Sequence, residues 1–568
     1  MPSSARRWLL WGAAFLLVYA ILCWAPPIYD DRRYFLENPL VHGPWPGLRA
    51  FLDQSTFGGQ ATESPLTFLL HRLLYSLAGE HMLLCRLTSL LLHAANVLLF
   101  YRVCRRLLDD ADLAFAAAAL FSLFPTHVEV LAISTYKTHL IVSFCALLVM
   151  DLQAREGGWW RDCACWAALV LAALFKESAV VIPFLALLVD RLGPEAGRRR
   201  NAALHAGLFA IAGAYLVLRV TCIPLQGQVL DLRGGFWANH LLTSAKVFLW
   251  DLGHLLLPWP LSLEHDLRTV RQAQGAVPIL AALAAVAFLS HRLYRRDRLA
   301  WGGWVWAALA LGPFLNLVPH QNFSLVSDRY LYLASAGYVL ALARLAGLWS
   351  EGRPAARRLV LLAGTALAAC YGALALRHGG RFLDPVELWT HAVERAPRNF
   401  RTYANLGEAY RDRGLYEQAA SVLSRAIELA PQYPDAHMDL ALTYASMDRL
   451  DDAIAEARRR VALLPDFEGT VNLGAFLLNA GRPQEALPVL RQAVQLKPDS
   501  AEALIDLGLC ASALRRWDEA LDALDRATRG QVVDASQRPG LVAAALAAKR
   551  AAYAARAKRP PARGKPAR

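Results

Sequence analysis

Two adjacent carboxylates are the residues of this sequence best suited to chemistry. Asp30 and Asp31 lie in the stretch APPIYDDRRYF (25–35), directly after an apolar run over residues 8–24. One carboxylate of such a pair can act as a general base toward an acceptor hydroxyl, while the other orients that hydroxyl. The pair can also hold a divalent cation such as Mg²⁺ or Mn²⁺, which would neutralise a phosphate leaving group. The spacing predicts an acid–base site where a first membrane span ends.

Further ionisable groups stand at the ends of other apolar runs. Such groups at membrane depth indicate a functional site, although any one of them alone fits an ordinary interfacial charge. The cations among them suit the phosphate of a lipid-linked substrate. Besides Asp30 and Asp31, the candidates are His127, Glu129, Lys137, Lys176, Glu177, Glu264, His265, Asp266, Asp328 and Arg329.

The composition indicates a polytopic membrane protein. Of the 568 residues, 56% are hydrophobic and 19% are charged, and the mean hydropathy is +0.29. Soluble globular proteins are less apolar and more charged. Apolar runs long enough to span a membrane recur until residue 376. We expect an all-α chain with a membrane domain over residues 1–380, a helical solenoid over 381–532 and a basic tail over 533–568.

Arginine clusters between the apolar runs predict the topology. Cytoplasmic loops carry an excess of Arg and Lys, so the side of Arg6 and Arg7 is expected to be cytoplasmic. The segment 240–259 would break this pattern if it crossed, and we expect it to lie at the outer interface. Eleven spans then remain, which puts the C-terminal third outside; an even count would move it to the cytoplasm. The expected spans are 8–25, 81–101, 111–125, 133–151, 163–175, 178–190, 203–222, 276–291, 299–318, 331–349 and 358–376.

The last third contains internal repeats. Pro397, Pro431, Pro465 and Pro498 recur at intervals of about 34 residues, which is the period of tetratricopeptide helix pairs. The stretch YANLGEAYRDRGLYEQAASVLSRAIELAP (403–431) has the large and small residues of such a repeat at their usual spacing. These helix pairs bury their apolar faces only by stacking on their neighbours. We expect four repeats that form a solenoid, which could recruit an acceptor or serve self-association, followed by a tail without a packed core.

The order of these motifs resembles that of a known family. The chain is similar to the transmembrane-and-tetratricopeptide-repeat O-mannosyltransferases, which are class C glycosyltransferases that use polyprenyl-phosphate sugars. The matching segments extend over nearly the whole chain, and the repeats follow them. These segments include YDDRRYFLENPLV (29–41), FPTHVEVLA (124–132), FKESAVVIPFLALLVD (175–190), LPWPLSLEHD (257–266) and LVSDRYLYLASAGY (325–338).

The resemblance implies roles for several candidates. Asp30 would be the catalytic base and Asp31 its partner, although the two could be exchanged. The pairs 176–177 and 328–329 would line the donor pocket. The chain departs from the family at 63–66, where an expected Arg is missing, and at 135–138, where Lys137 is kept but an Asp is lost. These departures leave the sugar and the acceptor open.

Two other functions compete with a sugar transferase. A non-catalytic scaffold could recruit partners through its repeats, but it would have no need for the acidic pair. A cell-surface oligosaccharide ligase would keep its functional groups in a large outer loop late in the membrane domain. The excess of arginine over lysine and the abundant alanine favour a bacterial source, which would place the outer face in the periplasm. In a eukaryote the same face would lie in the endoplasmic reticulum lumen.

Overall fold

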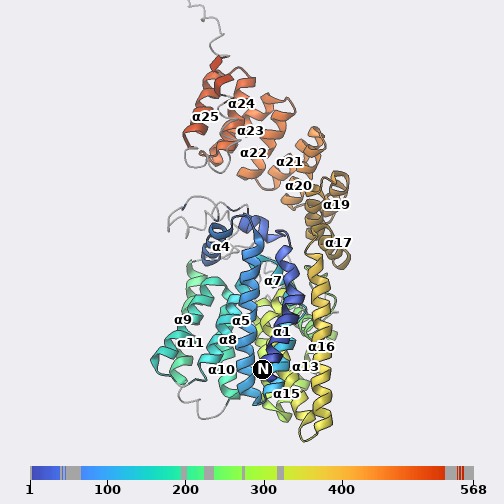
Figure 1. Ribbon diagram of the computed structural model, residues 1–568. Helices are drawn as coiled ribbons and strands as arrows, with labels where there is room; N and C mark the ends of the chain where they lie inside the picture. Colours follow the sequence, from blue (N-terminus) through green and yellow to red (C-terminus); the bar gives the residue numbers. More distant parts are fainter. Residues whose placement is uncertain are drawn as a thin grey trace, which may run out of the picture. The chain divides into compact units, whose positions relative to one another are not determined.

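The chain is described by a computed structural model whose described residues are mainly helical (Figure 1). Apart from single residues, it describes residues 3–36, 65–155, 157–193, 201–222, 236–270, 275–315, 325–530, 549–551 and 553–554. Residues 63 and 64 and most of the predicted tail lie outside these ranges. The described residues form two compact units, Met1–Arg395 and Ala396–Arg568, and contain no strand, which confirms the predicted all-α class.

The first unit is a bundle of long apolar helices joined by short helical turns. Its helices are α1 (Ser3–Tyr19), α4 (Pro65–Ala78), α5 (Met82–Leu108), α6 (Ala111–Ser122), α7 (His127–Ala132), α8 (Lys137–Leu152), α9 (Trp159–Phe175), α10 (Ile182–Leu192), α11 (Ala202–Cys222), α12 (Phe236–Leu256), α13 (Ala276–Arg296), α14 (Arg298–Leu311), α15 (Tyr332–Ser350), α16 (Pro354–Arg381) and α17 (Pro385–Arg395). The turns that matter for the site are η2 (Arg32–Leu36), η4 (Ser134–Tyr136), η5 (Glu177–Val181) and η9 (Asp328–Leu331).

Within the described part of this unit, seven helical segments are long and apolar enough to cross a membrane. They are Arg6–Trp24, Met82–Leu108, Ser134–Leu152, Ala202–Arg219, Ala276–Arg296, Asp328–Ser350 and Pro354–Arg381. The other four predicted spans fall on α6, α9, α10 and α14, which have 12, 17, 11 and 14 residues. Helix α12, expected at the interface, has 21 residues and is not among the seven. The count of eleven therefore stays a prediction.

The basic loops come together at one end of the bundle. At the end of α8, Asp151 pairs with Arg106 at 3.1 Å and with Arg102 at 3.2 Å, both from the last turns of α5. Asp110 caps α6 and pairs with Arg357 of α16 at 2.6 Å. Arg86 lies in the second turn of α5, and the helix between it and Arg106 is about 30 Å long. That length matches the hydrocarbon thickness of a bilayer.

Close packing of α14 against α15 fixes the start of α15. A Cβ atom added to Gly303 would lie 2.6 Å from the Gly337 carbonyl oxygen, and one added to Gly337 would lie 2.6 Å from that of Gly303. Small residues allow backbones in membranes to approach this closely. The buried Trp306 donates to the Leu333 carbonyl at 3.1 Å across the same contact. The turn η9, which carries Asp328 and Arg329, therefore leads directly into a closely packed helix pair.

The second unit is a stack of helix pairs at the spacing that the sequence predicts. The pairs are α18 (Phe400–Asp412) with α19 (Tyr416–Leu429), α20 (Pro434–Ser446) with α21 (Leu450–Leu463), α22 (Phe467–Asn479) with α23 (Pro483–Leu496), and α24 (Ala501–Ala513) with α25 (Trp517–Gly530). Within three of the pairs a glycine of the first helix contacts a leucine of the second. A Cβ on Gly407 would lie 2.4 Å from Leu423, and one on Gly474 would lie 2.4 Å from Leu490. The glycines let the paired helices touch.

Candidate functional site

The two carboxylates of the acidic pair lie in different surroundings. Asp31 is fully buried, and one of its oxygens lies 2.8 Å from Nη2 of Arg86, which is also fully buried. Its other oxygen accepts a hydrogen bond of 2.6 Å from the backbone N–H of Ser134. Asp31 thus ties the segment after α1 to α5 and to η4. Each of its two oxygens thus has a protein partner.

Asp30 is half-buried and accepts a hydrogen bond of 3.0 Å from the hydroxyl of Tyr136. The guanidinium of Arg329 lies over the same tyrosine ring, 4.4 Å from its centroid. The structure therefore gathers Asp30, Tyr136 and Arg329 around one ring, from three segments that are distant in the sequence. A half-exposed carboxylate next to a cation can accept a proton and stay close to an anion.

Arg329 is held by Glu129, another predicted site residue. The Glu129 carboxylate accepts from Nη1 of Arg329 at 2.5 Å and from its backbone N–H at 2.8 Å. Burial raises the pKa of Glu129, the Arg329 guanidinium opposes that rise and the Asp328 carboxylate adds to it. Nη2 of Arg329 lies 3.5 Å from the Tyr330 hydroxyl, a weak contact that a phosphate oxygen could replace. Glu129 thus orients the cation, and part of the guanidinium remains available.

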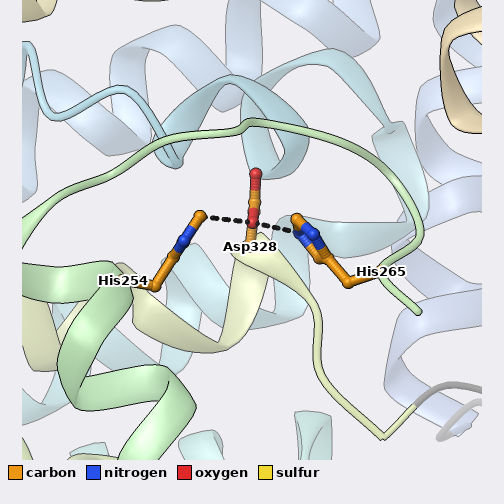
Figure 2. A group of neighbouring side chains, drawn as sticks. All are labelled: His254, His265 and Asp328. Carbon is orange, nitrogen blue, oxygen red and sulfur yellow. Dashed lines mark hydrogen bonds and ion pairs between the residues drawn. The ribbon is translucent and has the colours of Figure 1, made fainter. Parts of the chain in front are cut away.

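Asp328 faces a different group from its neighbour Arg329. One of its oxygens lies 2.8 Å from Nε2 of His265 and 3.2 Å from Nε2 of His254 (Figure 2). The backbone N–H of Ser262 approaches the other oxygen at 3.4 Å. The turn η9 therefore separates two clusters, one around Tyr136 and one around Asp328. Among the described residues, His254, His265 and Asp328 form the one group with the side chains and spacing to hold a metal ion.

The remaining candidates lie in three kinds of place. His127 is part of the aromatic core, where its Nε2 lies 2.9 Å from the Ser335 hydroxyl. Lys137 is buried and donates to the Ser134 carbonyl at 3.2 Å, so it braces η4 beside Asp31. Lys176 is half-exposed and precedes the exposed Glu177 at the start of η5. In the loop after α12, Glu264 is buried and Asp266 is exposed.

A small cavity adjoins Arg329. Its volume is about 20 Å³, and its lining includes Arg329, Tyr330, His139, Ser143 and Ser178. This is room for about one water molecule and not for a sugar phosphate. A donor would therefore have to widen the cavity or approach Arg329 from elsewhere.

Three of the residues that shape the site are not among the predicted site residues. Arg86 offered a signal, because it is a charge inside a long apolar helix. His254 offered a weaker one, as a polar residue in an apolar segment of spanning length. Tyr136 offered none, because a tyrosine at a membrane surface is common.

Parts of both units match known protein families. The family model for dolichyl-phosphate-mannose-protein mannosyltransferases matches residues 62–221, and two tetratricopeptide models match residues 407–448 and 477–545. A protein O-mannosyl-transferase of Caenorhabditis elegans is 23% identical over 72% of this chain and 60% of its own length. The chain is thus similar to the transmembrane-and-tetratricopeptide-repeat O-mannosyltransferases. The predicted resemblance is confirmed.

Two relatives from Drosophila melanogaster align over similar ranges. Protein O-mannosyl-transferase Tmtc3 is 24% identical over 86% of the chain and 64% of its own length. Protein O-mannosyl-transferase Tmtc1 is 27% identical over 73% of the chain and 60% of its own length. The chain thus spans about 60% of the length of these curated relatives. A crystal structure of YrrB, a tetratricopeptide-repeat protein, covers 31% of the chain and 86% of its own, at 22% identity and a TM-score of 0.27.

Proposed function

We propose that the chain is a membrane glycosyltransferase that moves a sugar, mannose by analogy with its relatives, from a polyprenyl-phosphate donor to an acceptor hydroxyl. The acceptor would be a protein Ser or Thr or a glycan on the extracytoplasmic face. The observation that carries the proposal is the grouping of the half-exposed Asp30 with Tyr136 and Arg329. The names of the relatives and the matching mannosyltransferase model support the same class.

In this reaction Asp30 acts as the general base. The acceptor O–H transfers its proton to the Asp30 carboxylate while the oxygen forms a bond to the anomeric carbon of the sugar. The bond from that carbon to the phosphate oxygen breaks, and its electron pair leaves with the polyprenyl phosphate. Arg329 neutralises the leaving phosphate, since a guanidinium binds phosphate through paired donors. Lys176 is a second cation at the surface for the same phosphate.

The position of the site agrees with this role. Asp30 and Arg329 lie at the bundle end away from the loops with Arg102 and Arg106, and cytoplasmic loops are the ones rich in arginine. A bacterial chain would carry out transfer on the periplasmic side of its inner membrane. The tetratricopeptide repeats would offer a surface for the acceptor protein, as expected for a helical solenoid.

A Mg²⁺ or Mn²⁺ ion between Asp30 and Asp31 would have to share Asp31 with its present partners. Asp31 already binds Arg86 and the Ser134 N–H through both oxygens. A hard cation bound there would lie next to the buried Arg86 guanidinium, and the two like charges would repel each other. The proposed step therefore uses Arg329 rather than an ion at the acidic pair.

The test is transfer of radiolabelled mannose from polyprenyl phosphate to a panel of proteins, peptides and glycans by the purified protein. We expect Asp30→Asn to lower transfer by about 10²–10⁴-fold, the usual contribution of a general base. Glu80→Gln, which alters an exposed carboxylate before α5, is the matched control and should transfer like wild type. If folded wild type binds no donor and Asp30→Asn behaves identically, a scaffold that recruits partners through its repeats replaces the proposal.

A further inference from the structure

Three side chains converge in the buried cluster shown in Figure 2. His254 comes from the last turn of α12, His265 from the loop after it, and Asp328 from the first residue of η9. Their side chains are 4%, 6% and 1% exposed. Both imidazole Nε2 atoms point at the same carboxylate oxygen (Figure 2). The cluster thus joins three segments at one point away from water.

The distances suit a shared metal ion. With metal–ligand bonds of about 2.0–2.1 Å in a tetrahedral site, neighbouring ligand atoms lie roughly 3.3 Å apart. The observed separations from the Asp328 oxygen are 2.8 Å to His265 and 3.2 Å to His254, and the three ligand atoms lie within 4.8 Å of one another. The two distances to Asp328 thus differ from ligand spacing by only a few tenths of an ångström, and the two imidazole nitrogens lie close enough to approach one ion.

Several buried polar atoms around this cluster lack a hydrogen-bond partner among the described residues. Although it lies 3.2 Å from Asp328, Nε2 of His254 has no properly oriented hydrogen bond to any described residue. One turn earlier on α12, Asp251 is fully buried, and neither of its oxygens has a hydrogen-bond partner in the described part of the chain. An unpaired buried carboxyl group is costly in either protonation state. A cation near Asp251 and Asp328 would balance both carboxylates.

The donor set selects the kind of ion. Two imidazole nitrogens and one carboxylate oxygen suit a borderline transition metal such as Zn²⁺, whereas Mg²⁺ and Ca²⁺ take oxygen ligands. Around the donors, the Trp250 ring stacks on His254 at 4.5 Å and contacts His265 at 4.6 Å, which shields this side of the cluster. Such a dry shell limits the exchange of an ion with solvent.

We propose that His254, His265 and Asp328 bind one divalent transition-metal ion of the zinc class, with Asp251 as a nearby charge partner. The ion joins α12 and its following loop to η9. Since Arg329 follows Asp328 directly, the ion positions that cation without contacting substrate. This site differs from the acidic pair and does not depend on the proposed sugar transfer.

The first test is the metal content of the full-length protein purified in detergent, measured by mass spectrometry after loading with Zn²⁺ and dialysis. We expect about one tightly bound equivalent per chain in wild type and its loss in His254→Ala and in His265→Ala. His291→Ala, at an exposed histidine of α13, is the matched control and should keep the ion. Wild type without bound metal overturns the proposal. Zinc retained by both cluster variants overturns it too, because the ion would then be bound elsewhere, for example by some of the nine cysteines.

A second measurement on wild type alone avoids any folding defect of the variants. Removing the ion with a chelator should lower the unfolding temperature, and adding Zn²⁺ but not Mg²⁺ should restore it. A chelator-insensitive unfolding temperature would contradict the proposal. The transfer assay is read separately, so a zinc-loaded protein that transfers no sugar counts against the proposed function alone. A metal-free protein that transfers sugar counts against the metal site alone.

Discussion

Two ion pairs, one from each unit of this chain, differ in how deeply they are buried. In the membrane unit the Asp31–Arg86 pair is fully buried, and Glu129 and Asp328 are almost so. In the repeat unit a typical pair, Arg449 with Asp452, is 48% and 50% exposed. Burying an ion pair costs desolvation that its attraction often fails to recover. Buried pairs such as Asp31–Arg86 therefore mark positions that have to be held, whereas exposed pairs such as Arg449–Asp452 serve solubility.

The two units also differ in how their helices pack together. In the repeat unit, the same contact between a glycine and a leucine builds three of the helix pairs. In the membrane unit the close contact of Gly303 with Gly337 joins α14 to α15 and serves one site. Stability of the repeats thus comes from repeated packing, and the geometry of the membrane site comes from individual contacts.

Breaking the buried Asp31–Arg86 ion pair should have the largest effect on stability. Arg86→Ala leaves Asp31 buried without its partner, and removal of one member of a buried pair costs about 3–5 kcal/mol. We expect the purified variant to unfold at a much lower temperature than wild type. The measurement is thermal unfolding in detergent, with the repeat unit as an internal reference.

The double variant Asp31→Asn with Arg86→Met sharpens this result. It removes both charges, so much of the lost stability should return, because no charge stays unpaired. If the double variant were as unstable as Arg86→Ala, the loss would come from the volume of the arginine and not from charge.

The repeats and the membrane character could be predicted because both are periodic. Pro397, Pro431 and Pro465 recur at a regular interval, and each repeat folds by contacts with its neighbours in sequence. Apolar length likewise predicted helices near the observed α5, α15 and α16. The acidic pair could be found because two carboxylates after an apolar run are conspicuous.

The partners that adjacent residues of the site contact could not be predicted. Asp30 and Asp31 are neighbours in sequence, yet one binds Tyr136 and the other Arg86. Both partners are distant along the chain, and only the packing of α5 and η4 brings them together. Asp328 and Arg329 diverge in the same way, toward His265 and toward Glu129. Local sequence carries no information on which of two adjacent side chains faces which neighbour.

Filling a repeat contact should have a smaller but clear effect. In Gly474→Ala the new methyl group would lie 2.4 Å from Cδ2 of Leu490, and overpacking of this kind costs about 1–3 kcal/mol. Chemical denaturation of the repeat unit within the full-length protein measures the loss. Adding Leu490→Val should make the double variant more stable than the sum of the single changes. Strict additivity would show that the two residues do not press on each other.

A buried histidine gives the repeats a dependence on pH. His437 shares a hydrogen bond of 2.7 Å with Glu456, and that bond raises the pKa of His437. A base that binds its proton more tightly when folded stabilises the fold below its unfolded pKa of about 6.5, and the gain is lost as pH rises through the folded value. Hydrogen exchange of α20 and α21 should therefore be slower at about pH 6 than at about pH 8, after correction for intrinsic rates. In His437→Asn this difference should disappear.

The exposed pair should matter least. Arg449 and Asp452 lie one helical turn apart at the surface, and pairs of this kind contribute about 0–1 kcal/mol because water and salt screen them. We expect Asp452→Asn to leave the unfolding temperature of the repeats within the error of wild type, at low and at high salt. Arg449 also lies over the Tyr444 ring at 4.4 Å, so the substitution is made at the aspartate. A loss as large as that of Arg86→Ala would erase the contrast between the two units, since charge would then stabilise both.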